Sequence, residues 1–189
     1  FDDMSGEVLD PVKVKEAREE ELVEIAKHQV WRKVSIKECW EATGKPPTSV
    51  RWVDTNKGGV EEEDMEVRSR LVARDFKGGD NDRDDLFAGT PPLEAKSLII
   101  SRAATRRRDG SSRKMLLIDV RKAHTNPLCQ EDVYNYLPEE CNCPPGMCAK
   151  WVHWLYGFRP AAAAWEKHHS EMLQGECSNR GDSCGMVFY

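Results

Sequence analysis

Apolar residues recur at helical spacing in some stretches and at every second position in others, which predicts a mixed α+β fold. Asp10-Pro11 is a favourable helix start, an N-cap residue followed by proline at the first helical position. Apolar residues then recur at helical spacing from Leu22 to Val30. We therefore expect residues 1–30 to hold an amphipathic helix that leads into a larger unit, residues 31–189.

A β-hairpin is predicted between Val50 and Phe76. Residues 56–59, Asn-Lys-Gly-Gly, are a strong turn signal between a strand that begins at Val50 and a return strand over Met65–Phe76. Arginines and apolar residues alternate on the return strand, which places them on opposite faces. The arginine face comprises Arg68, Arg70 and Arg74, and the apolar face comprises Val67, Leu71 and Ala73.

A helix is predicted from Leu93 to Arg107, and its last turn and the following loop are strongly basic. Positive charges there complement the helix dipole. They also form a basic patch close in sequence to Asp119, where a nucleic-acid backbone would lie. The patch comprises Arg102, Arg106, Arg107, Arg108, Arg113 and Lys114, against one acid, Asp109.

The apolar run 115–118 is predicted to be a strand buried on both faces, and it ends at Asp119. Burying a bare carboxylate is costly, so this strand should deliver Asp119 to a surface or a cleft. Residues 131–137 and 150–158 are predicted to be two further strands. An alanine-rich helix is expected over 161–173 and an extended run over 186–189.

Composition narrows the class of protein. Charged residues make up 32% and hydrophobic residues 39%, which favours a soluble globular protein, and no apolar run approaches a bilayer span, so we expect no membrane partner. A net charge of −5 argues against nucleic acid as a partner, but the local basic clusters override that average.

Seven cysteines without a secretory leader at Phe1 predict an intracellular protein with reduced thiols, in a cytoplasmic particle or the nucleus. Both termini look cut from a longer chain.

Two clusters invite metal-binding interpretations. Cys141, Cys143, Cys148 and His153 give C-x-C-x4-C-x4-H, a donor set that suits zinc, but the opening departs from C-x2-C and a cysteine-rich loop is the preferred interpretation. The acidic loop 78–85 fails as a calcium loop, because the positions that need Gly and Glu hold Asp and Pro. Solvated loop charge accounts for it better.

Several segments resemble motifs of one family, the reverse transcriptase domain of copia-type LTR retrotransposon polyproteins. IDVRKAHTNP followed by QEDVYNYLP is similar to the family's MDVKTAFLNG followed by EEEVYMEQP. LYGFRPAAAAW resembles LYGLKQAPRAW, and VRSRLVARDF resembles KARLVAKGF. The segments keep the family's order and similar separations over about three-quarters of the chain, from Trp31 onward, whereas any one motif alone would be weak.

The resemblance implies the fingers and partial palm of a right-hand polymerase, an RNA-directed DNA polymerase that uses two Mg2+ ions. Asp119 would be the first catalytic carboxylate, and the carbonyl of Val120 would join it as a metal ligand. The family completes the site with two adjacent aspartates further on, and Tyr189 ends this sequence before any such pair. Asp2-Asp3 and Asp84-Asp85 stand in the wrong context to replace them, so we expect this fragment alone to be inactive.

The resemblance also assigns binding roles. Arg68 and Arg70 would face the triphosphate or the template backbone, because guanidinium groups suit phosphate oxygens; the competing interpretation is a solvated edge-strand face. His124 stands where the family has the Phe that gates the sugar, and Pro160 stands where it has a Gln that contacts the incoming nucleotide. The partners implied are an RNA template, a DNA primer, deoxynucleoside triphosphates, and the integrase and ribonuclease H of the same polyprotein.

Two alternatives compete with an active polymerase. The departures at His124 and Pro160 are equally compatible with a divergent subfamily and with a catalytically dead remnant that at most binds nucleic acid. The other alternative takes Asp119 as the first acid of a ribonuclease-H-like nuclease, but the basic hairpin and the LYGFRPAAAAW segment have no place in that fold.

Overall fold

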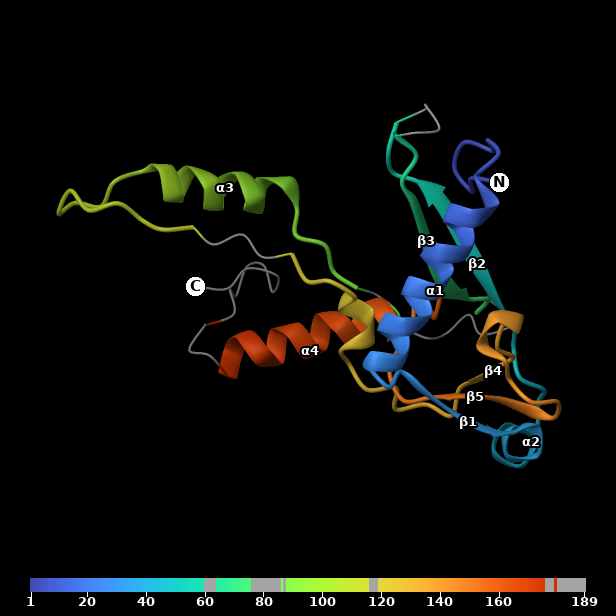
Figure 1. The fold of residues 1–189 in the computed structure, drawn as a ribbon. Coiled ribbons are helices and arrows are strands. Elements are labelled where there is room, and N and C mark those ends of the chain that lie inside the picture. The colour runs from blue at the N-terminus through green and yellow to red at the C-terminus, as the bar shows by residue number, and fades with distance from the viewer. Residues whose placement is uncertain (60–63, 76–85, 87, 116–118, 176–178, 180–189) are drawn as a thin grey trace.

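The computed structural model describes residues 1–59, 64–75, 86, 88–115, 119–175 and 179. Two small antiparallel sheets and four α-helices make up these residues, which confirms a mixed α+β fold at the coarse level (Figure 1). The predictions for 78–85, 116–118 and 186–189 lie outside the described residues. None of the described helices is long and apolar enough to span a bilayer.

Helix α1 (Pro11–Lys27) confirms the first prediction. The side chain of its N-cap, Asp10, accepts a hydrogen bond from Val12 N at 2.8 Å, and the helix ends at His28. The helix packs against the hairpin strand β3 and buries Ala17, Glu21 and Ile25. Residues 1–30 therefore share a core with the rest of the chain.

Strand β1 (Trp31–Ser35) and helix α2 (Ile36–Thr43) follow, and the sequence analysis missed both. The local signal for α2 was present, since Ser35 is followed three residues later by Glu38. The Ser35 hydroxyl accepts a hydrogen bond from Glu38 N at 3.2 Å. Gly44 ends the helix with a left-handed φ of 64°, a conformation that glycine adopts without cost.

The predicted hairpin is confirmed as β2 (Val50–Asn56) paired with β3 (Val67–Ala73). Its alternation is also confirmed, because Ser69, Leu71 and Ala73 are buried while the arginine face is not. Helix α1 covers the buried face. The opposite face, which we call the open face, carries Arg51, Val53, Thr55, Arg68, Arg70 and Val72.

The other sheet has the order β1-β5-β4, with β4 (Tyr134–Asn135) and β5 (Met147–Trp151). The two predicted strands were wrong in extent: only two residues of 131–137 are strand, and β5 begins before residue 150 and ends at Trp151. The chain leaves the sheet after Trp151 because residues 154–158 turn into the hydrophobic core and onto β3. Asn135 joins the two sheets, since its buried side chain donates to Thr48 Oγ1 and to the carbonyl of Ser49 ahead of β2.

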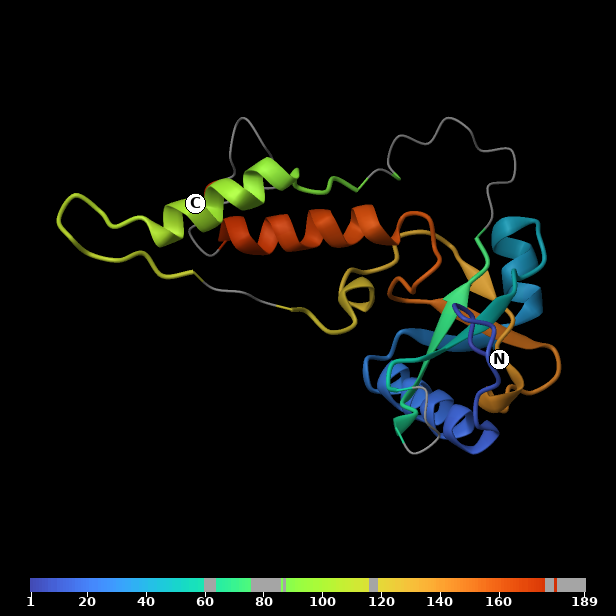
Figure 2. The same ribbon diagram turned by 90° about the horizontal axis from the view of Figure 1, so that it is seen from above.

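Helices α3 (Leu93–Ala104) and α4 (Ala161–Gly175) confirm two predictions, although α3 ends three residues before the predicted Arg107. Figures 1 and 2 show α3 and the loop after it reaching away from both sheets. Helix α3 buries none of its residues. We call residues 93–115 the basic arm.

The main hydrophobic core lies where α1, β3, β5 and the start of α4 meet. The described residues also form η3 (Ala123–Thr125), η4 (Glu139–Cys141) and two isolated bridges, Thr48 with Asn135 and Leu128 with His153. The core residues are Ile25, Val30, Leu71, Ala73, Trp151, Trp154, Leu155, Phe158 and Ala161.

Candidate nucleotide and nucleic-acid site

The open face of the hairpin is the basic surface that the strand alternation predicted. Arg68 is exposed and pairs with no carboxylate among the described residues. Arg51 is also exposed, but it forms an ion pair with Asp3 at 3.1 Å. Arg70 is half-buried, because an aromatic ring lies beneath it. The described structure therefore leaves Arg68 and Arg70 as the arginines of β3 that face away from α1.

Tyr156 is that ring, and it brings together residues from three distant segments. The guanidinium carbon of Arg70 lies 5.7 Å from the centre of the Tyr156 ring, within cation–π range. The imidazole of His124 meets the same ring edge-on, with centres 4.7 Å apart and planes at 90°. We call Arg70, His124 and Tyr156 the Tyr156 cluster. It contains two of the three residues that the sequence analysis assigned to nucleotide or template binding.

A close approach of backbones holds Tyr156 in place. Its carbonyl accepts a hydrogen bond from Ala73 N at the end of β3, 2.8 Å away. Gly157 follows with a φ of 89°, and a Cβ there would stand 2.3 Å from the carbonyl oxygen of Ala73. Only glycine fits both the left-handed backbone and the contact. Two residues on, Arg159 N donates to Asp75 Oδ2 at 3.0 Å, so the turn is fixed on both sides.

The short helix η3 carries His124 to this position. The Nδ1 atom of His124 lies 3.4 Å from the carbonyl oxygen of Ala161, the first residue of α4. Lys122, which precedes η3, has a left-handed φ of 53°, and its partly exposed ammonium forms an ion pair with the buried carboxylate of Glu21 in α1. Figure 1 shows this segment between α1 and the start of α4.

Asp119 lies on irregular backbone just before this segment, and it is exposed, as predicted. Its carboxylate and the carbonyl of Val120 are hard oxygen donors of the kind that magnesium prefers. However, no three His, Cys, Asp or Glu side chains among the described residues converge into a group that would hold a metal ion. Among the described residues, Asp119 and the carbonyl of Val120 therefore make at most half of a two-ion site.

The basic arm presents its arginines to solvent with one exception. Arg106, Arg107, Arg108 and Lys114 are exposed. Arg113 is half-buried, and its Nη1 donates to the carbonyls of Arg102 and Thr105 at 3.3 and 2.8 Å. It therefore satisfies carbonyls at the end of α3 and complements the helix dipole.

The cysteine-rich segment does not gather into a metal site within the described chain. Cys148 is fully buried in β5, and His153 Nδ1 lies 3.2 Å from the carbonyl oxygen of Asn126. Burial raises the pKa of the Cys141 and Cys148 thiols to about 11, which favours the protonated form over the thiolate that zinc binds. Cys141 belongs to η4 and Cys148 to β5, so these cysteines are spread over two elements and the turn between them rather than one loop.

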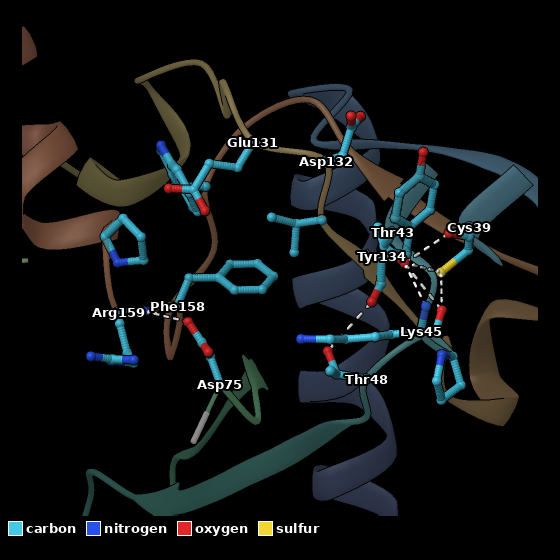
Figure 3. A pocket seen from close by; sticks show the side chains of 14 residues that line it. Cys39, Thr43, Lys45, Thr48, Asp75, Glu131, Asp132, Tyr134, Phe158 and Arg159 are labelled. Atoms are coloured by element: carbon cyan, nitrogen blue, oxygen red, sulfur yellow. Dashed lines mark hydrogen bonds between the residues drawn. The ribbon is translucent and has the colours of Figure 1, made fainter. Parts of the chain in front are cut away.

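A cavity of about 330 Å³ lies beside the same turn (Figure 3). Phe158 and Arg159 stand on one side of it, and Thr43, Lys45 and Tyr134 stand on the other (Figure 3). Its lining mixes apolar rings with charges of both signs. Pro160, which stands where the resembled family has a Gln that contacts the nucleotide, lines this cavity, whereas Asp119, Arg68, Arg70 and His124 do not.

Sequence reasoning missed Tyr156 and the Glu21–Lys122 pair. Tyr156 had a signal, because it stands in the LYGF segment next to a glycine. Glu21 had none: it is one of three consecutive glutamates, and nothing local marks the one that is buried.

Comparison with known proteins adds no family to this geometry: no family model, no curated protein and no solved structure matches the chain.

Proposed function

We propose that this chain forms the fingers and part of the palm of a copia-type reverse transcriptase, and that it binds a template–primer duplex along the open face of the hairpin. The incoming deoxynucleoside triphosphate would lie at the Tyr156 cluster. Integrase and ribonuclease H of the same polyprotein, together with an intracellular location, belong to the same proposal.

The observation that carries the proposal is the convergence at Tyr156. VRSRLVARDF supplies Arg70, IDVRKAHTNP supplies His124, and LYGFRPAAAAW supplies Tyr156 itself. These are the three segments whose resemblance suggested a polymerase, and they are separated by 54 and 32 residues (124 − 70 and 156 − 124). A chance match of unrelated segments gives no reason for them to meet at one ring.

The chemistry of the cluster suits a nucleotide. Arg70 keeps its N–H donors while its guanidinium lies over the Tyr156 ring, a contact that limits the entropy lost when a phosphate binds. Arg68 lies two residues away on the same face and extends the positive surface. His124 adds a ring of about the size needed to contact a ribose.

Salt dependence of duplex binding tests the proposal. If about four arginines contact phosphates, the logarithm of the binding constant should fall with the logarithm of salt concentration at a slope of roughly −3 to −4. Replacing Arg68 and Arg70 by Ala should weaken binding and flatten the slope by about two. Arg32→Ala is the matched control, because Arg32 is exposed but lies on β1 and pairs with Glu38. A flat response, or equal losses in the control, would refute phosphate contact by the open face.

Nucleotide incorporation separates the active polymerase from a dead remnant that only binds. The chain, a longer form that contains the downstream carboxylates, and that longer form with Asp119→Asn are assayed on a primed RNA template with magnesium. We expect incorporation by the longer form alone, with a loss of several orders of magnitude in the Asn variant, because positioning and charge carry phosphoryl transfer. Near-normal activity of the Asn variant would remove Asp119 from the mechanism, and an inactive longer form would favour the remnant.

A further inference from the structure

We propose that the partly buried ion pair between Glu21 and Lys122 is a positioning device that holds His124 in the Tyr156 cluster. Helix α1 would then do more than cover the hairpin: it would set the geometry of the segment that follows Asp119. The geometric statement stands by itself, whereas its importance for a bound nucleotide rests on the proposed function.

Glu21 depends on Lys122 for its charge compensation. The residue is only 6% exposed, and one carboxylate oxygen, Oε2, accepts from the Lys122 ammonium. The other oxygen, Oε1, is buried and meets no hydrogen-bond donor among the described residues. A buried carboxylate with one partner fixes that partner strongly, because the alternative is an uncompensated charge in a poorly solvated site.

Lys122 transmits this constraint through its backbone. Its φ of 53° is uncommon for a residue with a side chain, and such a conformation persists where the surroundings impose it. Its carbonyl accepts from Thr125 N at 2.9 Å, from Thr125 Oγ1 at 2.8 Å and from Asn126 Nδ2 at 3.2 Å. Lys122 thus begins and caps the turn η3, and Thr125 is buried beneath it.

His124 lies inside that turn, between the residue that begins it and the residue that is buried. Its ring reaches Tyr156 and the carbonyl of Ala161 only if the turn keeps its place. The resembled motif, MDVKTAFLNG, has Thr where this chain has Lys122, so the motif itself does not carry the pair. The ion pair across 101 residues is therefore a feature of this chain.

The imidazole signal of His124 in NMR spectra tests the inference without nucleic acid. The edge-on Tyr156 ring should shift the His124 Hε1 resonance away from its free-peptide position, and His124→Gln assigns the signal among the five histidines. Lys122→Met should return the signal toward the free-peptide value. Lys122→Arg keeps the charge and should retain the shift.

Two further variants separate positioning from stability. The double variant Glu21→Gln with Lys122→Met removes both charges, so it should recover the melting temperature that Lys122→Met loses. Its His124 signal should nevertheless stay near the free-peptide position, because the ion pair is still absent. Lys15→Met, on the exposed side of α1 and paired only with Glu19, should change neither. A His124 signal that keeps its wild-type position in a folded double variant would overturn the inference.

Duplex binding by the same proteins distinguishes the two proposals. If the variants that lack the ion pair move the His124 signal away from its wild-type position but bind duplex and nucleotide as before, the positioning inference stands and the proposed function is weakened. A His124 signal that stays in place would refute the positioning inference whether or not the protein binds nucleic acid.

Discussion

The hairpin packed against α1 and the basic arm both combine apolar residues with arginines, but they differ in how far the apolar residues are buried. Both place apolar residues next to arginines, but only the hairpin encloses them: Leu71 in β3 is 0% exposed, whereas Leu98 and Ile100 in α3 are 62% and 57% exposed.

Within the hairpin region, Arg18 donates to both oxygens of Asp54 at 2.7 and 3.4 Å, which raises the pKa of the guanidinium. Ser69 Oγ donates to the same carboxylate at 2.6 Å.

The difference teaches that amphipathic spacing predicts an element but says nothing of what covers it. A helix of 12 residues is marginal in water without tertiary packing. Helix α3 has the spacing and lacks a cover among the described residues, while α1 has both. Stability in this chain should therefore be concentrated in the hairpin region, and the following predictions test that contrast in order of decreasing effect.

Lys122→Met should give the largest loss, about 3–5 kcal/mol of unfolding free energy, because it leaves Glu21 buried without its partner. Denaturant titration measures it. Lys167→Met, whose lysine faces the exposed Glu171 on α4, should lose less than about 1 kcal/mol. Similar losses in both variants would mean that Lys122 does not compensate a buried charge on Glu21.

Leu71→Ala should cost about 2–5 kcal/mol, because it opens a cavity in the main core. Leu98→Ala removes the same atoms from an exposed position in α3 and should change the unfolding free energy by no more than about 0.5 kcal/mol. The same denaturant titration serves both. Comparable losses would show that the basic arm is covered in solution.

Gly157→Ala and Gly110→Ala make a matched pair with left-handed φ values of 89° and 80°. Both substitutions strain the backbone by about 1 kcal/mol or more. Gly157 adds a clash with Ala73, whereas a Cβ on Gly110 meets nothing within 4 Å. The melting temperature should therefore fall more for Gly157→Ala, which adds the clash to the strain, than for Gly110→Ala, which has the strain alone. A reversed order would contradict the close approach of the two backbones.

Arg113→Ala should weaken only α3. The lost contacts to the carbonyls of Arg102 and Thr105 are worth about 0.3–1 kcal/mol. Amide hydrogen exchange should speed up in α3 and stay unchanged in α1. The control is Arg106→Ala, an exposed neighbour, which should leave α3 exchange as it was.

A pH titration should give the smallest effect. Hydrogen bonds from the backbone N–H groups of Asn56, Ser5 and Met4 lower the pKa of Asp2. A lowered pKa in the folded state stabilises the fold above the ordinary Asp value near 3.9, and that contribution is lost as the pH falls through the folded-state pKa. The amide resonance of Asn56 should therefore titrate below pH 4 and not above it. Asp2→Asn should abolish the titration.

Local signals made much of this fold predictable. Asp10-Pro11 marked the start of α1, the 56–59 turn marked the hairpin, and the alanine run marked α4. The predicted strand over 150–158 was too long because its second half is held by Gly157 against β3, a contact across 84 residues (157 − 73). Hydrophobic spacing within one segment carries no information on such a partner.

In the candidate site, too, the sequence predicted features with a local signal and missed the contacts between distant segments. Strand parity alone placed Arg68 and Arg70 on one face, and the resemblance singled out His124. Neither could indicate that Arg70 and His124 share Tyr156, because a meeting of segments is a property of the fold. The burial of Glu21 was equally hidden, since its neighbours in sequence have the same charge and face solvent.

The first residues of the chain have a consequence for self-association. Strand β2 has an outer edge, and Asp3 occupies it: Asp3 N donates to the carbonyl of Asp54 at 2.9 Å, while the carboxylates of Asp3 and Asp2 accept from Asp54 N and Asn56 N. An open strand edge is a template for pairing with another molecule. Two acidic side chains close this one and would repel a like-charged neighbour. Removing residues 1–3 should thus expose this hairpin edge and favour aggregation through it.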